Sequence, residues 1–208
     1  MARYRGPACK LCRREGQKLF LKGFKCYTAK CTMDKRNFAP GMHGRRRAKL
    51  SPYGEQLREK QKVRRMYGIL EKQFRLLFEK ASQKKGKTGD VLLQMLETRL
   101  DNVVYRAGLA PARTTARMFV VHNHVTVNGR RVNVPSFQVR SGDVVAVKES
   151  DKSRKLAAEH LKMTESRIVP RWIDLDREKF IAKITDIPSR EDIEAPINEQ
   201  LIVELYSK

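Results

Sequence analysis

Four cysteines near the amino terminus are the side chains best suited to chemistry in this chain of 208 residues. The stretch CKLCRREGQKLFLKGFKCYTAKC begins at Cys9 and ends at Cys31, and Cys12 and Cys26 complete the set. The spacing within each pair, C-x2-C and C-x4-C, is typical of structural thiolate sites. In a reducing compartment such cysteines favour a metal over disulfides. The set predicts a closed zinc site, with an iron–sulfur cluster or four reduced thiols as alternatives.

A metal would order a segment that is poor in large apolar side chains. Residues 1–31 contain only Leu11, Leu19, Phe20, Leu21 and Phe24 of this kind, too few for a core. Metal binding supplies roughly 10–16 kcal/mol of folding free energy in small zinc peptides. Because basic residues surround the cysteines, the ordered arm would present a surface suited to phosphates.

The charge of the chain is strongly polarised. The formal net charge is +22. Residues 1–50 contain fifteen lysines and arginines and two acids, whereas residues 151–208 contain eleven and twelve. This gradient is typical of a protein whose first part binds a polyanion. No apolar run is long enough to span a membrane and no signal segment is seen, so we expect a cytoplasmic protein without membrane contact.

Hydrophobic periodicity predicts helices in the first half of the chain. A basic, turn-rich loop occupies residues 37–54, and helices are expected at 54–67 and 70–82. Ser51 is placed to cap the first of them. Residues 91–108 are predicted to form one long helix that ends at Gly108.

A shorter helix with Ala116 and Phe119 on its inner side is expected next, followed by strands. Asn128-Gly129 predicts a tight hairpin, and residues 142–149 a further strand. Residues 153–163 are expected to be helical. RWIDLD, FIAKIT and the terminal QLIVELYS are predicted to be three strands that extend the sheet, which makes the fold class α+β.

Two sets of motifs resemble a known family. ETRLDNVVYRAG, AR..AR and HNHVTVNGRRV..PS..VRSGD, between Glu97 and Lys148, resemble the RNA-binding module named after small-subunit ribosomal protein S4. MARYRGP..KLCRREG, PG.HG, YG.QLREKQKVRRMYGI.E.QF and NEQLIVELYSK extend the resemblance to bacterial S4 proteins over essentially the whole chain. All four cysteines of the metal-binding form of that family are present.

The resemblance implies a structural role in translation, in the small ribosomal subunit, and no enzymatic activity. Family members bind small-subunit rRNA early in assembly, at a multi-helix junction of the 5′ domain. They lie beside small-subunit proteins three and five where messenger RNA enters, and influence decoding accuracy through protein five. The resemblance therefore implies rRNA, messenger RNA and these two proteins as partners, and no homo-oligomer is expected.

The resemblance also suggests domains and site residues. The expected segments are a metal-knotted arm (1–44), a helical subdomain (45–90), a helix-turn-helix and sheet module for RNA (91–150) and a helix with strands (151–208). The predicted rRNA contacts are Arg3, Tyr4, Arg13, Arg14, Lys22, Arg58, Lys60, Lys62, Arg64, Arg65, Tyr67, Arg99, Arg106, Arg113, Arg117, His122, His124 and Asn128. Arg45, Arg46, Arg47 and Lys49 are predicted to line the messenger RNA channel, and Glu199 and Glu204 to face protein. The predicted module core is Leu100, Val103, Val104, Ala116, Val127 and Val134.

Two positions depart from the family pattern. Ala112 stands where the family commonly has a serine that caps the second helix, and the lost hydrogen bond costs about 1 kcal/mol. Asn123 stands where the family often has glycine, and asparagine tolerates the left-handed conformation that such a turn requires. Neither departure is expected to abolish RNA binding.

Two other classes of function fit the sequence less well. The S4 module also occurs in pseudouridine synthases and a tyrosyl synthetase, but this chain has no room for their catalytic domains and no phosphate-binding glycine loop. Asp101 is better explained by a salt bridge on a helix surface than by catalysis. A zinc-dependent transcription regulator would use a helix-turn-helix on DNA, yet the hairpin and the basic arm fit RNA better.

Overall fold

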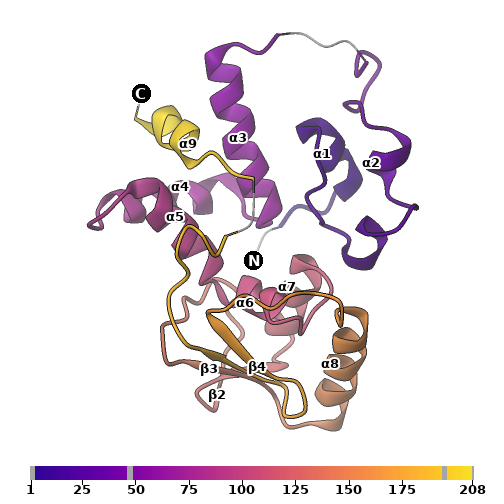
Figure 1. Cartoon of the computed structure of the whole chain (residues 1–208), viewed down its shortest axis with the longest axis vertical. Coiled ribbons are helices and arrows are strands. Elements are labelled where there is room, and N and C mark those ends of the chain that lie inside the picture. The colour runs from indigo at the N-terminus through magenta and orange to yellow at the C-terminus, as the bar shows by residue number, and fades with distance from the viewer. Residues whose placement is uncertain (1–2, 46–48, 194–195, 208) are drawn as a thin grey trace. The chain divides into compact units, whose positions relative to one another are not determined.

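The structure is a computed structural model that describes residues 3–45, 49–193 and 196–207. The described residues form two compact units (Figure 1). The first contains residues 3–45, 49–92 and 196–207, and the second contains residues 93–193. Helices and one antiparallel sheet together confirm the α+β class. No helix within these ranges is both long and apolar enough to cross a membrane.

The first unit is helical. Its elements are α1 (Ala8–Glu15), a 3-10 turn (Gly23–Cys26), α2 (Thr32–Lys35), α3 (Pro52–Met66), α4 (Glu71–Ser82) and α9 (Glu199–Tyr206). The Ser51 hydroxyl accepts a hydrogen bond from the Gly54 amide at 3.2 Å, which confirms the predicted cap of α3. Helix α5 (Thr88–Glu97) runs from this unit into the second.

The core of the first unit is closed by the last helix. Phe74 and Phe78 of α4 are buried, as their spacing predicted. Tyr206 of α9 stacks on Phe78 with ring centroids 4.6 Å apart, and α9 lies along α3 (Figure 1). The prediction of a strand at QLIVELYS was wrong. Helical spacing places Ile202 and Tyr206 on one side, where both pack inward, and this tertiary packing outweighs the strand propensity of the segment.

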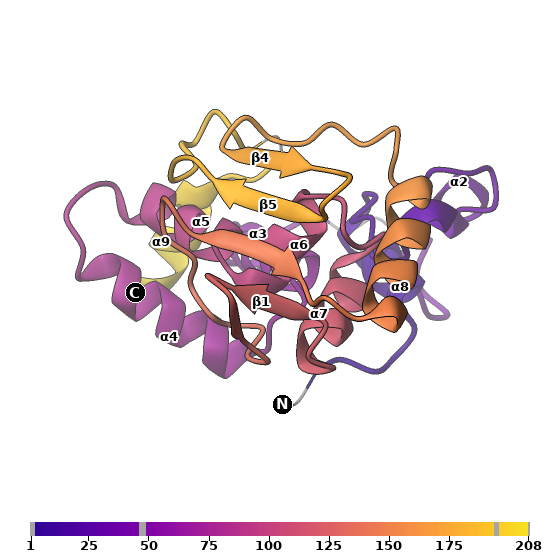
Figure 2. The same ribbon diagram turned by 90° about the horizontal axis from the view of Figure 1, so that it is seen from below.

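The second unit combines helices with a five-stranded antiparallel sheet. After α5 come α6 (Leu100–Arg106), α7 (Arg113–Val121), β1 (Val125–Val127), β2 (Arg130–Arg131), β3 (Val144–Val147), α8 (Asp151–Met163), β4 (Ile173–Asp176) and β5 (Ile181–Ile184). The strand order is β2-β1-β3-β5-β4 (Figure 2). Val145 of β3 is paired with Ala182 of β5, so β4 and β5 do extend the sheet as predicted.

The core of this unit lies between α6, α7 and the sheet. Leu100, Val104, Phe119, Val125 and Ala182 are all buried in one cluster. Of the predicted module core, Leu100, Val103, Val104, Ala116 and Val127 are buried. Val134 is 44% exposed, and its prediction was wrong because its carbonyl accepts from Phe137 in a surface turn.

The long helix predicted for residues 91–108 is interrupted. Thr98 and Arg99 leave the helical path because they pair with the segment around Gln138. The Val139 amide donates to the Thr98 carbonyl at 3.0 Å, and the Leu100 amide donates to the Phe137 carbonyl at 2.8 Å. Periodicity continues across this break, so the sequence pattern did not reveal it.

Two turns have the predicted conformations. Asn128 and Gly129 have φ values of 49° and 76°, which fit the tight hairpin between β1 and β2. Asn123 has a φ of 62°, the left-handed conformation expected there. Ala112 is the N-cap residue of α7 and makes no side-chain cap, as predicted.

Candidate nucleic-acid interface

The four cysteines lie in one small arm of the first unit. Cys12, Cys26 and Cys31 are buried and Cys9 is half-buried. Burial raises the pKa of the Cys12 thiol, and the other three thiols raise it further while a backbone hydrogen bond opposes them. The Lys22 amide donates to Cys26 Sγ at 3.4 Å. Across the described ranges, no group of three or more Cys, His, Asp or Glu side chains is arranged to hold a metal ion, so the metal knot stays a prediction.

Two arginines of α3 share one buried acid. Arg58 Nη1 lies 3.4 Å from Glu15 Oε1, and Arg65 Nη1 contacts the same oxygen. The Glu15 side chain is 2% exposed, so burial raises the pKa of its carboxyl while both guanidinium groups oppose that rise. Both arginines therefore tie α3 to α1 in this unit, and their contact with RNA stays a prediction.

The other basic residues of α3 are also paired. Lys60 Nζ lies 2.6 Å from Glu71 Oε1, and Arg64 Nε lies 3.6 Å from Glu71 Oε2. Lys62 pairs with Glu59 and donates to the Pro196 carbonyl at 2.8 Å. Acids of the first unit thus offset much of the positive charge of α3.

Other predicted contacts of the first unit differ in exposure. Arg13 donates to the Phe38 and Ala39 carbonyls, and both Arg13 and Arg45 lie over the Phe38 ring. Tyr67 is buried, at 4% exposure. Arg3, Tyr4, Arg14, Lys22, Arg45 and Lys49 are exposed. Arg46 and Arg47 lie outside the described residues.

A buried ion triad joins α6 to α7 in the second unit. Arg99 binds Asp101 through two hydrogen bonds, Nε to Oδ1 at 3.0 Å and Nη2 to Oδ2 at 2.8 Å. Arg117 Nη1 donates to the same Oδ2 at 3.3 Å. Arg99 is 2% exposed and Asp101 is 5% exposed. The predicted salt bridge of Asp101 is therefore present, but its predicted place on the helix surface was wrong.

A second network holds the arginines at the ends of these helices. Arg106 donates to both oxygens of Glu97, at 2.9 and 2.7 Å. The Asn102 amide nitrogen donates to Glu97 at 2.6 Å, and the Asn102 oxygen accepts from Arg113 Nε at 2.8 Å. Arg113 also lies over the Tyr105 ring, 4.4 Å from its centroid.

Glu97 was not identified as a functional residue from the sequence. Its spacing of five and nine residues from Asn102 and Arg106 fits no helical face, because the break at Arg99 separates them. Arg167, also not identified, donates to the carbonyls of Tyr105, Ala110 and Pro111 and so fixes the turn between α6 and α7.

The predicted polar residues near the hairpin have structural partners. His124 Nδ1 lies 2.8 Å from the Ser153 hydroxyl, and its ring stacks on Phe119. Burial lowers the pKa of His124, while His122 is exposed. The Asn128 side chain donates to Asp143 and accepts from the Val144 amide, both at 2.8 Å.

The two acids predicted to face protein lie on α9 of the first unit. Glu204 accepts a hydrogen bond from Gln56 at 2.9 Å, and Glu199 is half-buried on the same helix.

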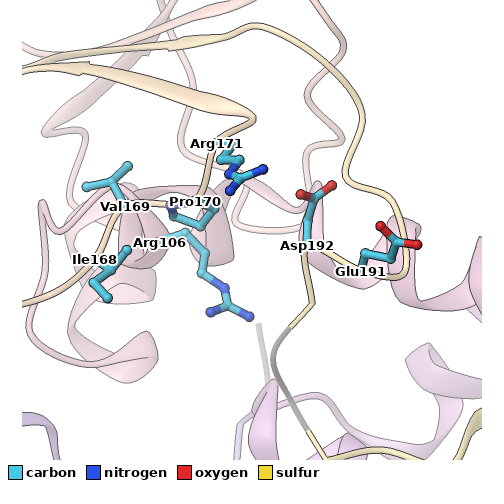
Figure 3. Close-up of a pocket in the computed structure, with 7 residues that line it drawn as sticks. All are labelled: Arg106, Ile168, Val169, Pro170, Arg171, Glu191 and Asp192. Atoms are coloured by element: carbon cyan, nitrogen blue, oxygen red, sulfur yellow. The ribbon is translucent and has the colours of Figure 1, made fainter.

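Arg106 also lines an open pocket of about 430 Å³ in the second unit (Figure 3). The other lining residues are Ile168, Val169, Pro170, Arg171, Glu191 and Asp192. Two guanidinium groups and two carboxylates offset one another here. The pocket is therefore poorly suited to a simple anion, and the arginines of α6 and α7 remain the better candidate interface.

Comparisons with known proteins agree with the S4 resemblance. A family described as "Ribosomal protein S4/S9 N-terminal domain" matches residues 3–97, and one described as "S4 domain" matches residues 98–145. Relatives called "Small ribosomal subunit protein uS4" are 59% identical in Geobacter metallireducens, 58% in Geobacter sulfurreducens and 55% in Halothermothrix orenii. Each match covers the full length of both chains.

These relatives are ribosomal proteins rather than enzymes, which supports the prediction that this chain is not an enzyme. The similarity is continuous from the cysteine arm to the last helix, and the two matching family descriptions follow one another along the chain. The chain accordingly belongs to the S4 family of small ribosomal subunit proteins.

Proposed function

We propose that this chain binds small-subunit rRNA early in subunit assembly, at a multi-helix junction of the 5′ domain. The observation that supports this most is the fixed set of guanidinium groups on α6 and α7, where Arg106 and Arg113 are held by a common network. Arginine presents several donors in a rigid plane that suits phosphate oxygens. Folded RNA offers such oxygens in a defined three-dimensional arrangement, so shape rather than base sequence would select the site.

Binding to a transcript of the 5′ domain of the rRNA tests this proposal. With six to ten phosphate contacts, affinity should fall by about 10³- to 10⁵-fold between 50 and 200 mM salt. A duplex DNA of equal length is the competitor. Binding that prefers the DNA, or that has no preference between the two, would favour the transcription-regulator alternative instead.

The exposed basic loop is proposed to line the channel through which messenger RNA enters. Arg45 and Lys49 are exposed, which suits contact with a passing strand. Exchange of both for alanine should reduce cross-linking between assembled subunits and messenger RNA without changing rRNA binding. Equal loss of both activities would mean that these residues serve rRNA instead.

Contacts with small-subunit proteins five and three, and through protein five an influence on decoding accuracy, are proposed for the two acids of α9. Glu199 and Glu204 lie on this helix. Reversal of both charges to lysine should lower the incorporation of protein five into reconstituted subunits and change the misreading rate. Unchanged incorporation would exclude these two acids from that contact.

The four cysteines are proposed to hold one zinc ion. The donor chemistry suits zinc, because four thiols lie in one arm and Cys26 accepts a backbone amide of the kind that orients metal ligands. Since no three side chains of the described residues are arranged to hold a metal ion, binding would have to draw these thiols together. Bound zinc would act structurally, with Cys9, Cys12, Cys26 and Cys31 as thiolates, and would restrain the basic arm.

Elemental analysis of protein purified without oxygen or added metal tests the metal proposal. About one zinc per chain is expected for a tetrahedral four-thiolate site. Several irons with labile sulfide would identify an iron–sulfur cluster instead of zinc. Four titratable thiols without any metal would refute the site.

A further inference from the structure

A buried acid, Glu97, lies at the centre of the network that holds Arg106 and Arg113. The Glu97 side chain is 1% exposed, and it accepts hydrogen bonds from Arg106 and Asn102. Asn102 also donates to the Glu97 carbonyl, at 2.9 Å. A buried carboxylate of this kind is stable only when cations and donors surround it.

Glu97 also determines how Asn102 is oriented. A carboxylate only accepts hydrogen bonds, so the amide nitrogen of Asn102 must face Glu97. Its oxygen then faces the other way, toward Arg113, whose Nε donates to it at 2.8 Å. One acid thus fixes Arg106 directly and Arg113 through one intervening side chain.

The aromatic ring beside this network restrains the same group from another direction. Arg113 lies 4.4 Å from the Tyr105 ring centroid, and Arg167 lies 4.3 Å from it. Arg167 is in turn bonded to the backbone of the turn that precedes α7. Arg113 is therefore held by an amide and by a ring that is itself fixed.

We infer that Glu97 is a positioning residue for RNA binding, because it holds the Arg106 and Arg113 guanidinium groups in the orientation that RNA phosphates meet. This inference rests on the proposed rRNA binding. An arginine that is already fixed loses less conformational entropy when it contacts a phosphate. The negative charge of Glu97 opposes the approach of RNA, so the two effects of this residue have opposite signs.

Glu97→Gln separates the two effects. The exchange keeps the shape of the side chain but removes its charge, and it replaces one carboxylate oxygen by an amide nitrogen that cannot accept from Arg106 or Asn102. Positioning predicts that rRNA affinity falls about ten-fold, whereas simple charge removal predicts equal or about two-fold tighter binding. Glu149→Gln is the matched control, because Glu149 is an exposed acid of the same unit that pairs only weakly with Arg154 at 3.4 Å. The rRNA affinity of this control variant should stay unchanged or rise slightly.

A double-mutant cycle distinguishes positioning from a general loss of structure. In an Arg106→Ala/Arg113→Ala background only the charge effect is left, so Glu97→Gln should no longer weaken binding and affinity should stay equal or become about two-fold tighter. Additive losses would overturn the inference, as would a Glu97→Gln variant that binds as tightly as the original chain. The fluorescence of Trp172, which is 3% exposed in this unit, verifies folding.

A second variant covers the case in which Glu97→Gln does not fold. Asn102→Ala leaves the pair of Glu97 and Arg106 intact but removes the oxygen that accepts from Arg113 Nε. It should weaken rRNA binding about three-fold, and should have no effect when Arg113 is already alanine. If Asn102→Ala still weakens rRNA binding when Arg113 is alanine, Asn102 does not act by holding Arg113. Failure of the original chain to prefer rRNA over duplex DNA would instead refute the proposed function itself.

Discussion

The exchange Asp101→Asn should strongly destabilise the second unit. Asp101 accepts three hydrogen bonds from two buried guanidinium groups, two from Arg99 and one from Arg117. Asparagine keeps one oxygen acceptor and no charge, and its amide nitrogen points donors at the guanidinium groups. Removal of one partner from a buried ion pair costs about 3–5 kcal/mol. Because Arg99 is only 2% exposed, water cannot compensate for that loss.

Urea unfolding followed by tryptophan fluorescence measures the effect. The chain has a single tryptophan, Trp172, which is buried in the core cluster of the second unit. Its signal therefore reports the unfolding of this unit in the intact chain. The free energy of unfolding should fall by about 3–5 kcal/mol, with an unchanged slope against urea concentration.

A matched control and a clear negative outcome accompany this experiment. Glu149→Gln removes an acid whose side chain is 87% exposed and should change stability by less than about 0.5 kcal/mol. If Asp101→Asn costs less than about 1 kcal/mol, the buried triad does not stabilise the unit and the reasoning from burial fails.

Three further predictions concern the cap of α7, the docking of α9, and the half-buried His124 with the buried His160. Ala112→Ser supplies the missing cap and should raise the free energy of unfolding by about 1 kcal/mol in the same fluorescence assay; no gain would show that the hydroxyl does not reach an α7 amide. Tyr206→Phe removes the hydrogen bond to Glu71, 3.0 Å long, and should speed amide exchange in α9 by about five-fold; unchanged exchange would contradict this. Burial lowers the pKa of His124 and His160, so the unfolded chain takes up protons first as the pH falls. The second unit should lose stability as the pH drops through about 6.5, and His124→Gln/His160→Gln should reduce that loss.

Features set by neighbouring residues were predictable from the sequence. The Ser51 cap requires only an oxygen three residues before an amide, and the Asn128-Gly129 turn requires only two residues that tolerate positive φ. The strands β3, β4 and β5 were found for the same reason, since alternation along a few residues indicates a half-buried strand. The S4 resemblance, carried by motifs spread along the whole chain, identified the family.

Features set by distant partners were not predictable in this way. The break at Thr98 depends on Gln138, forty residues later, whose side chain accepts from the Thr98 hydroxyl at 2.8 Å. The helical state of α9 depends on Phe78 and Gln56, which lie far earlier in the chain. Periodicity shows which side of a segment is apolar, but not which other segment will cover it.

The candidate site shows the same limit. The family resemblance predicted rRNA contacts at Arg99, Arg106, Arg113 and Arg117, but it did not distinguish the environments of these side chains. Arg99 is nearly inaccessible, whereas Arg106 and Arg113 are only partly buried. The difference comes from the acids: Asp101 draws Arg99 inward, and Glu97 holds Arg106 at the end of α6.

The pairing of α3 with α9 determines which of the two units can finish folding first during synthesis. Gln56 of α3 donates to Glu204 of α9, 148 residues later, whereas the second unit is one uninterrupted stretch of chain. At about 5–20 residues per second, α3 waits roughly 7 to 30 seconds for its partner after it is made. The second unit can therefore be complete while the first still exposes an apolar surface. A nascent chain stalled before α9 should recruit chaperones that the finished protein no longer needs.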